Sequence, residues 1–194
     1  MKNQKIVLAS SSPYRGELLS RLHIKFAQAS PSIDESSLPN ETPHELVSRL
    51  ALEKAKALSE NYNDALIIGS DQVAILNNHV LGKPGNHNNA VKQLKNASGQ
   101  TVTFLTSLCL YNSQTQQHQL DVIQYKVGFR DLSDNEIENY LRLEEPYNCA
   151  GSFKSEGLGV ALFSHQEGDD PTSLIGLPLI RLISMLKNED FYVL

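Results

Sequence analysis

Short apolar runs alternate with amphipathic segments along the whole chain, and polar turns separate them. Runs rich in β-branched and other apolar residues predict strands at 5–9, 26–29, 66–76, 79–81, 102–111 and 119–129. Helical apolar spacing predicts helices at 14–22, 43–59, 88–95, 134–143 and 174–186. Capping boxes, Thr42 with Glu45 and Ser133 with Glu136, mark two of the helix starts. This mixture indicates an α/β fold with a mixed central sheet.

The stretch 66–76 is unusual because Asp71 and Gln72 interrupt two apolar runs. An unpaired carboxylate in a buried strand costs free energy, because its charge loses hydration. Asp71 would therefore need a metal, a cation or a reacting water beside it. The alternative is an Asx-turn, in which Gly69, Ser70 and Asp71 form the turn of a hairpin. These residues alone leave both interpretations open.

A second unusual position is Lys54, which lies on the apolar stripe of the helix expected at 43–59. Lys54 follows Val47 by seven residues and Leu50 by four, so the three share one helix face. Such a lysine commonly carries its charge back to water along its aliphatic stem. The alternative is that Lys54 reaches an anionic ligand.

Two loops carry residues that suit phosphate binding. Ser10, Ser12 and Arg15 surround the start of the first helix, where unpaired N–H groups and the helix dipole attract anions. An ordinary helix N-cap with one surface arginine is the alternative. The loop lacks the Walker and the dinucleotide-binding glycine patterns. Lys83 lies in a later turn rich in glycine and proline, and Glu35 belongs to an acidic pair in a polar segment.

Composition limits the classes of partner. The 194 residues fit one domain, and 17 basic against 22 acidic residues give a net charge of −5. This charge argues against long nucleic acid and anionic membrane as partners, whereas a few local cations suffice for a free nucleotide. Cys109 and Cys149 have no disulfide or zinc spacing and indicate reduced thiols. The six histidines are scattered, so a histidine metal site is not expected.

The N-terminal segment carries no targeting pattern. Lys2 and Lys5 are followed by an apolar run of only five residues, 6–10, which is too short for a signal-peptide core or a membrane span. We therefore expect a cytoplasmic protein.

Six short motifs follow one another along the chain: ASSSPYR at 9–15, DE at 34–35, EKA at 53–55, GSDQ at 69–72, GKP at 82–84 and IGLP at 175–178. Their order and distances resemble the Maf family of nucleoside triphosphate pyrophosphatases over nearly the whole chain. The resemblance implies a single Maf-like domain at 1–194, with a mixed α/β fold in two lobes around a cleft, similar to inosine triphosphate pyrophosphatases. It also implies metal-dependent cleavage of a nucleoside triphosphate to a monophosphate and pyrophosphate.

The resemblance also implies roles for the matching residues. A triphosphate carries about four negative charges, so lysines, an arginine and a metal suit the cleavage of its α,β bond. We expect a small nucleotide substrate and no long nucleic acid or membrane, and the sequence leaves a homodimer open. The implied residues are Asp71 as proton acceptor, Lys54 and Lys83 as catalytic lysines, Ser10, Ser12 and Arg15 as substrate-binding residues, and Glu35 and Asp71 as ligands of a divalent cation, Mg²⁺ or Mn²⁺.

Three positions bear on the choice of base. In the branch of the family that acts on dTTP and UTP, two arginines follow the proline, a threonine follows the catalytic aspartate, and a glutamine precedes a later glycine. Here those places hold Tyr14, Gln72 and Glu156, which resembles the branch that hydrolyses 7-methyl-GTP. Methylation at N7 makes guanine cationic, and a cation over the Tyr14 ring gains about 0.5–2 kcal/mol. The Glu156 carboxylate can accept both N–H groups of the guanine edge.

Two alternatives stay open at this point. One is a pyrophosphatase for dTTP, UTP or other modified nucleotides. The other is a nucleotide-binding regulator of cell division, in which hydrolysis is incidental. Binding alone needs no proton acceptor, so the presence of Asp71 favours an enzyme.

Overall fold

The computed structural model describes residues 4–194, and Lys2 lies outside the described residues. Strands and helices alternate along the chain, which confirms the predicted α/β class. In chain order the elements are β1 (Lys5–Ala9), α1 (Pro13–Ser20), β2 (Phe26–Ala29), α2 (Pro43–Lys56), β3 (Ala65–Leu76), β4 (His79–Leu81), α3 (His87–Ala97), β5 (Thr101–Asn112), β6 (Gln117–Phe129), α4 (Asp134–Glu144), the 3-10 helices η1 (Ala150–Ser152) and η2 (Leu158–Leu162), β7 (Phe163–Glu167), α5 (Pro171–Ile175) and α6 (Leu179–Asn188).

Within residues 4–194, seven strands form one sheet. Its order is β2-β1-β3-β5-β6-β7, and β4 pairs with β3 outside this path. β1 pairs in parallel with β2 and β3, whereas the pairs β3/β4 and β6/β7 are antiparallel. The prediction of a mixed sheet is therefore confirmed.

The chain divides into two compact units. Unit 1 comprises the described residues up to Gln72, then Thr106–Ile123 and Asp170–Leu194. Unit 2 comprises Val73–Leu105 and Gln124–Asp169. A single domain over 1–194 stays a prediction.

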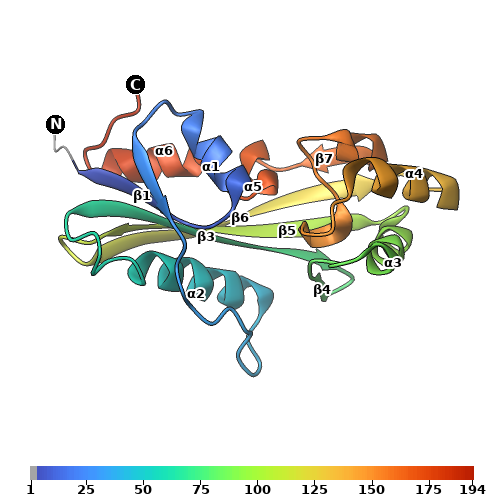
Figure 1. The fold of residues 1–194 in the computed structure, drawn as a ribbon, viewed down its shortest axis with the longest axis horizontal. Coiled ribbons are helices and arrows are strands. Elements are labelled where there is room, and N and C mark those ends of the chain that lie inside the picture. Colours follow the sequence, from blue (N-terminus) through green and yellow to red (C-terminus); the bar gives the residue numbers. More distant parts are fainter. Residues whose placement is uncertain (1–3) are drawn as a thin grey trace. The chain divides into compact units, whose positions relative to one another are not determined.

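Alternation along the strands of unit 1 sends side chains into two different hydrophobic cores. Even-numbered strand residues such as Ile6, Leu66 and Leu108 pack with α1 and α6. Odd-numbered strand residues such as Val7 and Ile67 pack with α2. Figure 1 shows α2 on one side of these strands and α1 and α6 on the other. The alternation therefore decides which helix faces each polar residue further along β3.

Gly69 brings α2 close to β3. A Cβ atom at this position would lie 2.0 Å from the carbonyl oxygen of Ala51 in α2. A side chain does not fit this gap, so the approach requires glycine. Ser107 of β5 supports the same contact, because its hydroxyl donates to the carbonyl oxygen of Val47 at 2.6 Å. α2 is thereby held against the sheet about one turn before Lys54, at Ala51, and about two turns before it, at Val47.

Unit 2 is built around aromatic side chains. The Phe153 ring makes edge-to-face contacts with Phe104, Phe129 and Phe163, and the ring centroids are 5.4, 5.5 and 5.0 Å apart. Such edge-to-face pairs contribute stability beyond the area that they bury. Phe153 is buried and lies between η1 and η2, so these contacts anchor the segment 152–157 to its unit.

β3 runs without a break from Ala65 to Leu76, so Asp71 lies inside a strand. The Asx-turn interpretation of this stretch is therefore wrong. The hairpin turn comes later, at Asn77 and Asn78, whose φ angles are 50° and 65°. Asparagine tolerates this left-handed conformation, and the strand predicted at 79–81 follows the turn as β4.

The helix predicted at 174–186 is wrong at its start. Two helices, α5 and α6, occupy this region, and Gly176 separates them with a φ of 121°. A helix cannot continue through this angle, and Pro178 then precedes α6. Strand β7 was not predicted, because its side chains are mostly polar and exposed. Backbone pairing with β6, rather than side-chain alternation, makes it a strand.

No helix in the described part of the chain, 4–194, combines the length and the hydropathy needed to cross a bilayer. Both cysteines lie in this part, and no disulfide joins them. Burial raises the pKa of the Cys109 thiol to about 12. This thiol therefore stays protonated at neutral pH.

Candidate active site

Lys54 joins the carboxylates of Asp71 and Glu35. Its Nζ atom lies 2.6 Å from Oδ1 of Asp71 and 3.0 Å from Oε1 of Glu35. The side chains of Lys54, Asp71 and Glu35 are 6%, 13% and 59% exposed. Lys54 thus does not carry its charge out to water, and that interpretation is wrong. Of the three partners expected for Asp71, a metal, a cation or a reacting water, Lys54 is the cation.

Strand alternation places Asp71 on the α2 side of β3. Odd-numbered residues of this strand face the core that α2 covers. The backbone is held here by Ser107, whose hydroxyl accepts the N–H of Asp71 at 3.0 Å and donates to Val47 of α2. Because Gly69 permits the close approach of α2, Lys54 reaches the carboxylate from the next turn of the helix.

Arg49 on α2 holds the segment that carries Glu35. Its guanidinium donates two hydrogen bonds to Glu41, at 2.6 and 2.9 Å, and one to the carbonyl oxygen of Ser36 at 2.9 Å. Hydrogen bonding from Arg49 lowers the pKa of Glu41 to about 2. Ser36 follows Glu35 directly, so Arg49 fixes the backbone beside the Glu35 carboxylate.

The loop after β1 arranges Ser10, Ser12 and Arg15 around the start of α1. Ser12 is the N-cap, and its hydroxyl accepts the N–H of Arg15 at 3.4 Å. The Ser10 hydroxyl accepts from the Ser12 N–H at 3.1 Å and from Nη1 of Arg15 at 3.4 Å. Gln28 of β2 donates to the carbonyl oxygens of Ser10 and Ser12 at 2.9 and 3.0 Å. The ordinary N-cap is therefore present, but Arg15 is partly buried rather than a surface arginine.

Arg15 also contacts the corner between α5 and α6. Its Nε donates to the carbonyl oxygen of Gly176 at 2.8 Å, and the Ser70 hydroxyl donates to the same oxygen at 2.9 Å. Burial lowers the pKa of Arg15, and the carboxylates of Asp71 and Glu35 act in the opposite direction. The arginine and the two acids therefore belong to one group of interacting charges in unit 1.

Gln72 faces the side of β3 opposite to Asp71. Its Nε2 lies 2.9 Å from the hydroxyl of Thr106. The same nitrogen lies 2.8 and 3.1 Å from the carbonyl oxygens of Ser173 and Leu174. An amide has two N–H groups, so these acceptors take up its donor capacity. The Gln72 amide nitrogen therefore ties β3 to β5 and α5.

The acids near Lys54 fit a divalent cation that takes most of its ligands from substrate and water. Across residues 4–194, no three His, Cys, Asp or Glu side chains gather as a metal site. Asp71 and Glu35 are two carboxylates that meet at one ammonium group. Mg²⁺ commonly binds one or two carboxylates and completes its shell with phosphate oxygens and water. The donor set predicted for the metal is therefore of a suitable kind and lies in one unit.

Lys83 lies in unit 2, in the exposed turn between β4 and α3. Gln93 of α3 donates through Nε2 to the carbonyl oxygen of Gly82 at 3.0 Å. Asn89 of the same helix donates to the carbonyl oxygen of Pro84 at 3.0 Å. The backbone is thus held on both sides of Lys83.

Glu156 is exposed and lies in the segment 152–157 of unit 2. Hydrogen bonds connect this segment to α4. The Tyr140 hydroxyl accepts the N–H of Lys154 at 3.0 Å. Lys154 Nζ in turn donates to the carbonyl oxygen of Glu144 at 2.5 Å. Burial raises the pKa of Tyr140, so its hydroxyl stays protonated at neutral pH. The backbone around Glu156 is therefore supported from the C-terminal half of α4.

The residues predicted from the sequence thus fall into two groups. Tyr14 lies in the first turn of α1 and is partly exposed. A shared role of the two groups at one substrate stays a prediction. Unit 1 contains Ser10, Ser12, Tyr14, Arg15, Glu35, Lys54, Asp71 and Gln72, and unit 2 contains Lys83 and Glu156.

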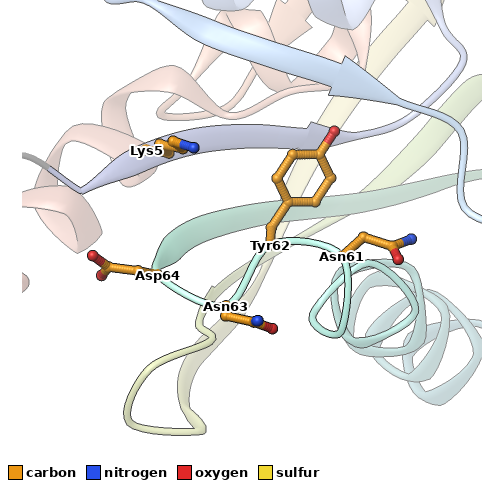
Figure 2. Close-up of a pocket in the computed structure, with 5 residues that line it drawn as sticks. All are labelled: Lys5, Asn61, Tyr62, Asn63 and Asp64. Atoms are coloured by element: carbon orange, nitrogen blue, oxygen red, sulfur yellow. The ribbon is translucent and has the colours of Figure 1, made fainter.

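A hollow of about 290 Å³ lies elsewhere in unit 1, lined by Lys5 and residues 61–64 (Figure 2). Lys5 begins β1, and Asp64 precedes β3, so the hollow lies at the amino ends of these parallel strands. Ser10 follows the carboxyl end of β1. Ligands of open α/β sheets bind beyond the carboxyl ends of the strands. The hollow is therefore not part of the candidate site.

Comparison with known proteins identifies the family. The family model described as Maf-like protein matches residues 5–189. The chain belongs to the Maf family. The 7-methyl-GTP pyrophosphatase of Pseudomonas savastanoi pv. phaseolicola is 59% identical to it, over 97% of this chain and 98% of the relative. Proteins of the same name from Methylobacillus flagellatus and Colwellia psychrerythraea are 54% and 53% identical, over 97% of this chain and 98% and 94% of the relatives. The resemblance predicted from the motifs is confirmed.

Some residues that support this Maf site were not predicted. Thr106 and Ser107 form a polar pair inside the apolar strand β5, which is the kind of signal that singled out Asp71. The glycine of the IGLP motif was recognised, but the part played by the Gly176 carbonyl was not. Arg49 carries no local signal, because its partners Glu41 and Ser36 lie outside α2.

Proposed function

We propose that this Maf-family chain is a nucleoside triphosphate pyrophosphatase that hydrolyses 7-methyl-GTP to 7-methyl-GMP and pyrophosphate. The near-full-length relatives that carry this name support the substrate. The observation that carries the chemistry is the contact of Lys54 with both Asp71 and Glu35, which holds a proton acceptor beside a cation and a second acid. The reaction would remove a modified nucleotide from the free pool, and we infer a cytoplasmic location from this role.

The start of α1 is the proposed phosphate site of unit 1. The N-terminus of a helix presents N–H groups and a positive dipole end to an anion. Ser10 and Ser12 add hydroxyl groups, and the guanidinium of Arg15 adds a positive charge that hydrogen bonds hold in place. Arg15 is suited to this role because its planar group can pair with two phosphate oxygens.

Asp71 is the proposed general base. Lys54 holds Oδ1 at 2.6 Å, so we assign the attacking water to Oδ2. The water oxygen bonds to the α-phosphorus, and the proton of the water passes to Asp71. The bond from the α-phosphorus to the bridging oxygen breaks, and pyrophosphate leaves with its electron pair. Lys54 and Lys83 stabilise the negative charge that develops on the phosphates.

Mg²⁺ or Mn²⁺ is the proposed cofactor, held by Glu35 and Asp71. When bound, such an ion supplies positive charge to the phosphate oxygens. Glu35 is 59% exposed, so its carboxylate is accessible to an ion that arrives with the substrate. Arg49 keeps the backbone beside Glu35 in place through Ser36.

Glu156 and Tyr14 are the residues proposed to select the base. A carboxylate accepts both N–H groups of a guanine edge, and the ring face of a tyrosine attracts the cationic methylated base. A pyrimidine would place a carbonyl oxygen against the carboxylate, and each buried group left unpaired costs about 1–3 kcal/mol. We therefore expect kcat/KM to fall from 7-methyl-GTP to GTP and then to pyrimidine nucleotides.

Pyrophosphate release by the purified chain tests this function. The assay compares 7-methyl-GTP, GTP, UTP and dTTP, each with Mg²⁺ and with Mn²⁺. The highest kcat/KM for 7-methyl-GTP supports the proposal. A preference for UTP or dTTP would contradict the proposed base specificity, but it would still agree with a pyrophosphatase. Binding of nucleotide without release of pyrophosphate from any substrate would favour a nucleotide-binding regulator.

A further inference from the structure

Gln93 of α3 connects the two loops of unit 2 that carry Lys83 and Glu156. Its Nε2 donates to the carbonyl oxygen of Gly82 at 3.0 Å, next to Lys83. Its Oε1 accepts from the Ser152 hydroxyl at 2.5 Å, at the start of the segment with Glu156. A single amide therefore holds both loops, each through a different atom.

Ser152 makes this contact specific. Ser152 is fully buried, and its φ angle of 63° lies in the left-handed region. A buried hydroxyl requires a hydrogen-bond partner, and the Gln93 carbonyl oxygen provides one. The next residue, Phe153, is fixed in the aromatic core of unit 2. The position of the segment that follows is therefore set by Gln93 and by the Phe153 ring.

The turn around Lys83 is supported by the same helix. Asn89, one turn before Gln93, donates to the carbonyl oxygen of Pro84 at 3.0 Å. The backbone on either side of Lys83 thus depends on α3, whereas the Lys83 residue itself is exposed. This arrangement fixes where the lysine leaves the backbone and keeps its ammonium group accessible to a ligand.

We propose that Gln93 is a positioning residue that couples the placement of Lys83 to that of the Glu156 segment. The loop of Lys83, proposed to contact the phosphates, and the segment of Glu156, proposed to select the base, are then both supported by Gln93 in unit 2. The inference rests on the proposed function, because it takes Lys83 to contact the phosphates and Glu156 to select the base. Gln93 acts through Gly82 on one side and through Ser152 on the other.

Two single variants separate the two sides of this contact. Gln93→Glu keeps an oxygen that accepts from Ser152, but replaces the N–H that faces the Gly82 carbonyl with a second oxygen. Ser152→Ala removes the hydroxyl and leaves the bond from Gln93 to Gly82. Gln93→Met, which has a similar length, removes both hydrogen bonds. Lys92→Ala, at an exposed position of α3, is the matched control.

Each variant is assayed for kcat and KM with 7-methyl-GTP, GTP and UTP, and its melting temperature is measured. Loss of one hydrogen bond should change the affected constant by about 2- to 13-fold, which corresponds to about 0.5–1.5 kcal/mol. Gln93→Glu should raise KM for all three nucleotides alike and keep their ratios. Ser152→Ala should lower the preference for 7-methyl-GTP over UTP and keep KM for UTP. Gln93→Met should show both changes, and Lys92→Ala neither.

These outcomes decide the inference. The separation of KM from base preference supports the inference. If Gln93→Glu does not fold, it is supported instead by a change in base preference alone in Ser152→Ala together with both changes in Gln93→Met. Suppose that the wild type is active, and that the variants only melt at lower temperatures and show no separation of KM from base preference. This result would overturn the inference and leave the proposed function unaffected. Variants that match the wild type in every constant would overturn it too. A wild type that releases no pyrophosphate would overturn the proposed function and this inference with it.

Discussion

The Nζ atom of Lys54 lies 2.6 Å from Oδ1 of Asp71, although the two residues are 17 positions apart, one in a helix and the other in a strand. The contact depends on Gly69, because any side chain there would push α2 away from β3. It also depends on Ser107, which holds the backbone of Asp71 and the carbonyl of Val47 together. The charge of the proposed base is thus balanced by a lysine whose position the helix packing determines.

Asp71→Asn should abolish turnover and leave the fold intact. The amide keeps the size and shape of the carboxylate, but it cannot accept a proton from water. Loss of a general base lowers kcat by about 10²- to 10⁴-fold. Pyrophosphate release is measured beside the circular dichroism spectrum, with Asp64→Asn at the amino end of β3 as the control. Turnover within a few fold of the wild type would remove Asp71 from the proposed mechanism.

Lys54→Met should lower turnover and also stability. Methionine keeps the aliphatic stem but leaves the partly buried Asp71 carboxylate without its ammonium partner, which costs about 1–3 kcal/mol. Loss of one stabilising cation lowers kcat by about 10²-fold or more. The double variant Lys54→Met with Asp71→Asn removes both charges and should regain stability without regaining turnover. If the double variant regains turnover, the pair has only a structural role.

Glu35→Gln should raise the concentration of Mg²⁺ or Mn²⁺ needed for half-maximal activity, because the amide replaces one of two carboxylate ligands. Binding of Mn²⁺ to the protein with nucleotide, followed by electron paramagnetic resonance, should weaken in parallel. Asp34→Asn is the matched control, since an asparagine oxygen can still accept the Ser36 N–H that Asp34 accepts at 2.9 Å. If Glu35→Gln needs the same metal concentration as the wild type, Glu35 is not a metal ligand and is an ordinary exposed loop residue.

Glu156→Gln and Tyr14→Ala should change base preference in different ways. The glutamine amide offers one acceptor and one donor, so the preference for guanine nucleotides over UTP should shrink. Loss of the Tyr14 ring should narrow only the gap between 7-methyl-GTP and GTP, by about 2- to 30-fold, which corresponds to about 0.5–2 kcal/mol. The ratios of kcat/KM measure both effects. If kcat/KM falls by the same factor for all nucleotides, the substitution has disturbed the site as a whole and the residue does not select the base.

Glu41→Gln should change how thermal stability depends on pH. Hydrogen bonds from Arg49 lower the pKa of Glu41 to about 2, below the ordinary value of about 4.3. A lowered pKa means that ionised Glu41 stabilises the fold above about pH 4 and that this stabilisation disappears as pH falls toward 2. The variant should therefore have a lower melting temperature than the wild type at pH 7. Its melting temperature should also fall less than that of the wild type between pH 5 and pH 2. Glu60→Gln, an exposed glutamate after α2, should follow the wild-type curve.

The sequence by itself determined most of the elements and the family, although it missed β7 and the break between α5 and α6. The capping residues at Thr42 and Ser133 and the proline at position 43 specify where α2 and α4 begin, because these effects act within one helical turn. The period of the apolar residues identified most strands. The six motifs identified the Maf family, because each is a local string whose order along the chain can be read directly.

Only the tertiary structure decided what surrounds each functional residue. The sequence allowed Asp71 to be a turn residue and Lys54 to be a lysine that reaches water. The unbroken strand β3 excluded the first interpretation, and the packing of α2 on β3 excluded the second. The Nε of Arg15 contacts the carbonyl of Gly176, a residue 161 positions away. Backbone carbonyls are the same at every residue, so no sequence pattern marks the one that a distant side chain will use. Such partners are chosen by strand register and helix packing, which the whole chain determines together.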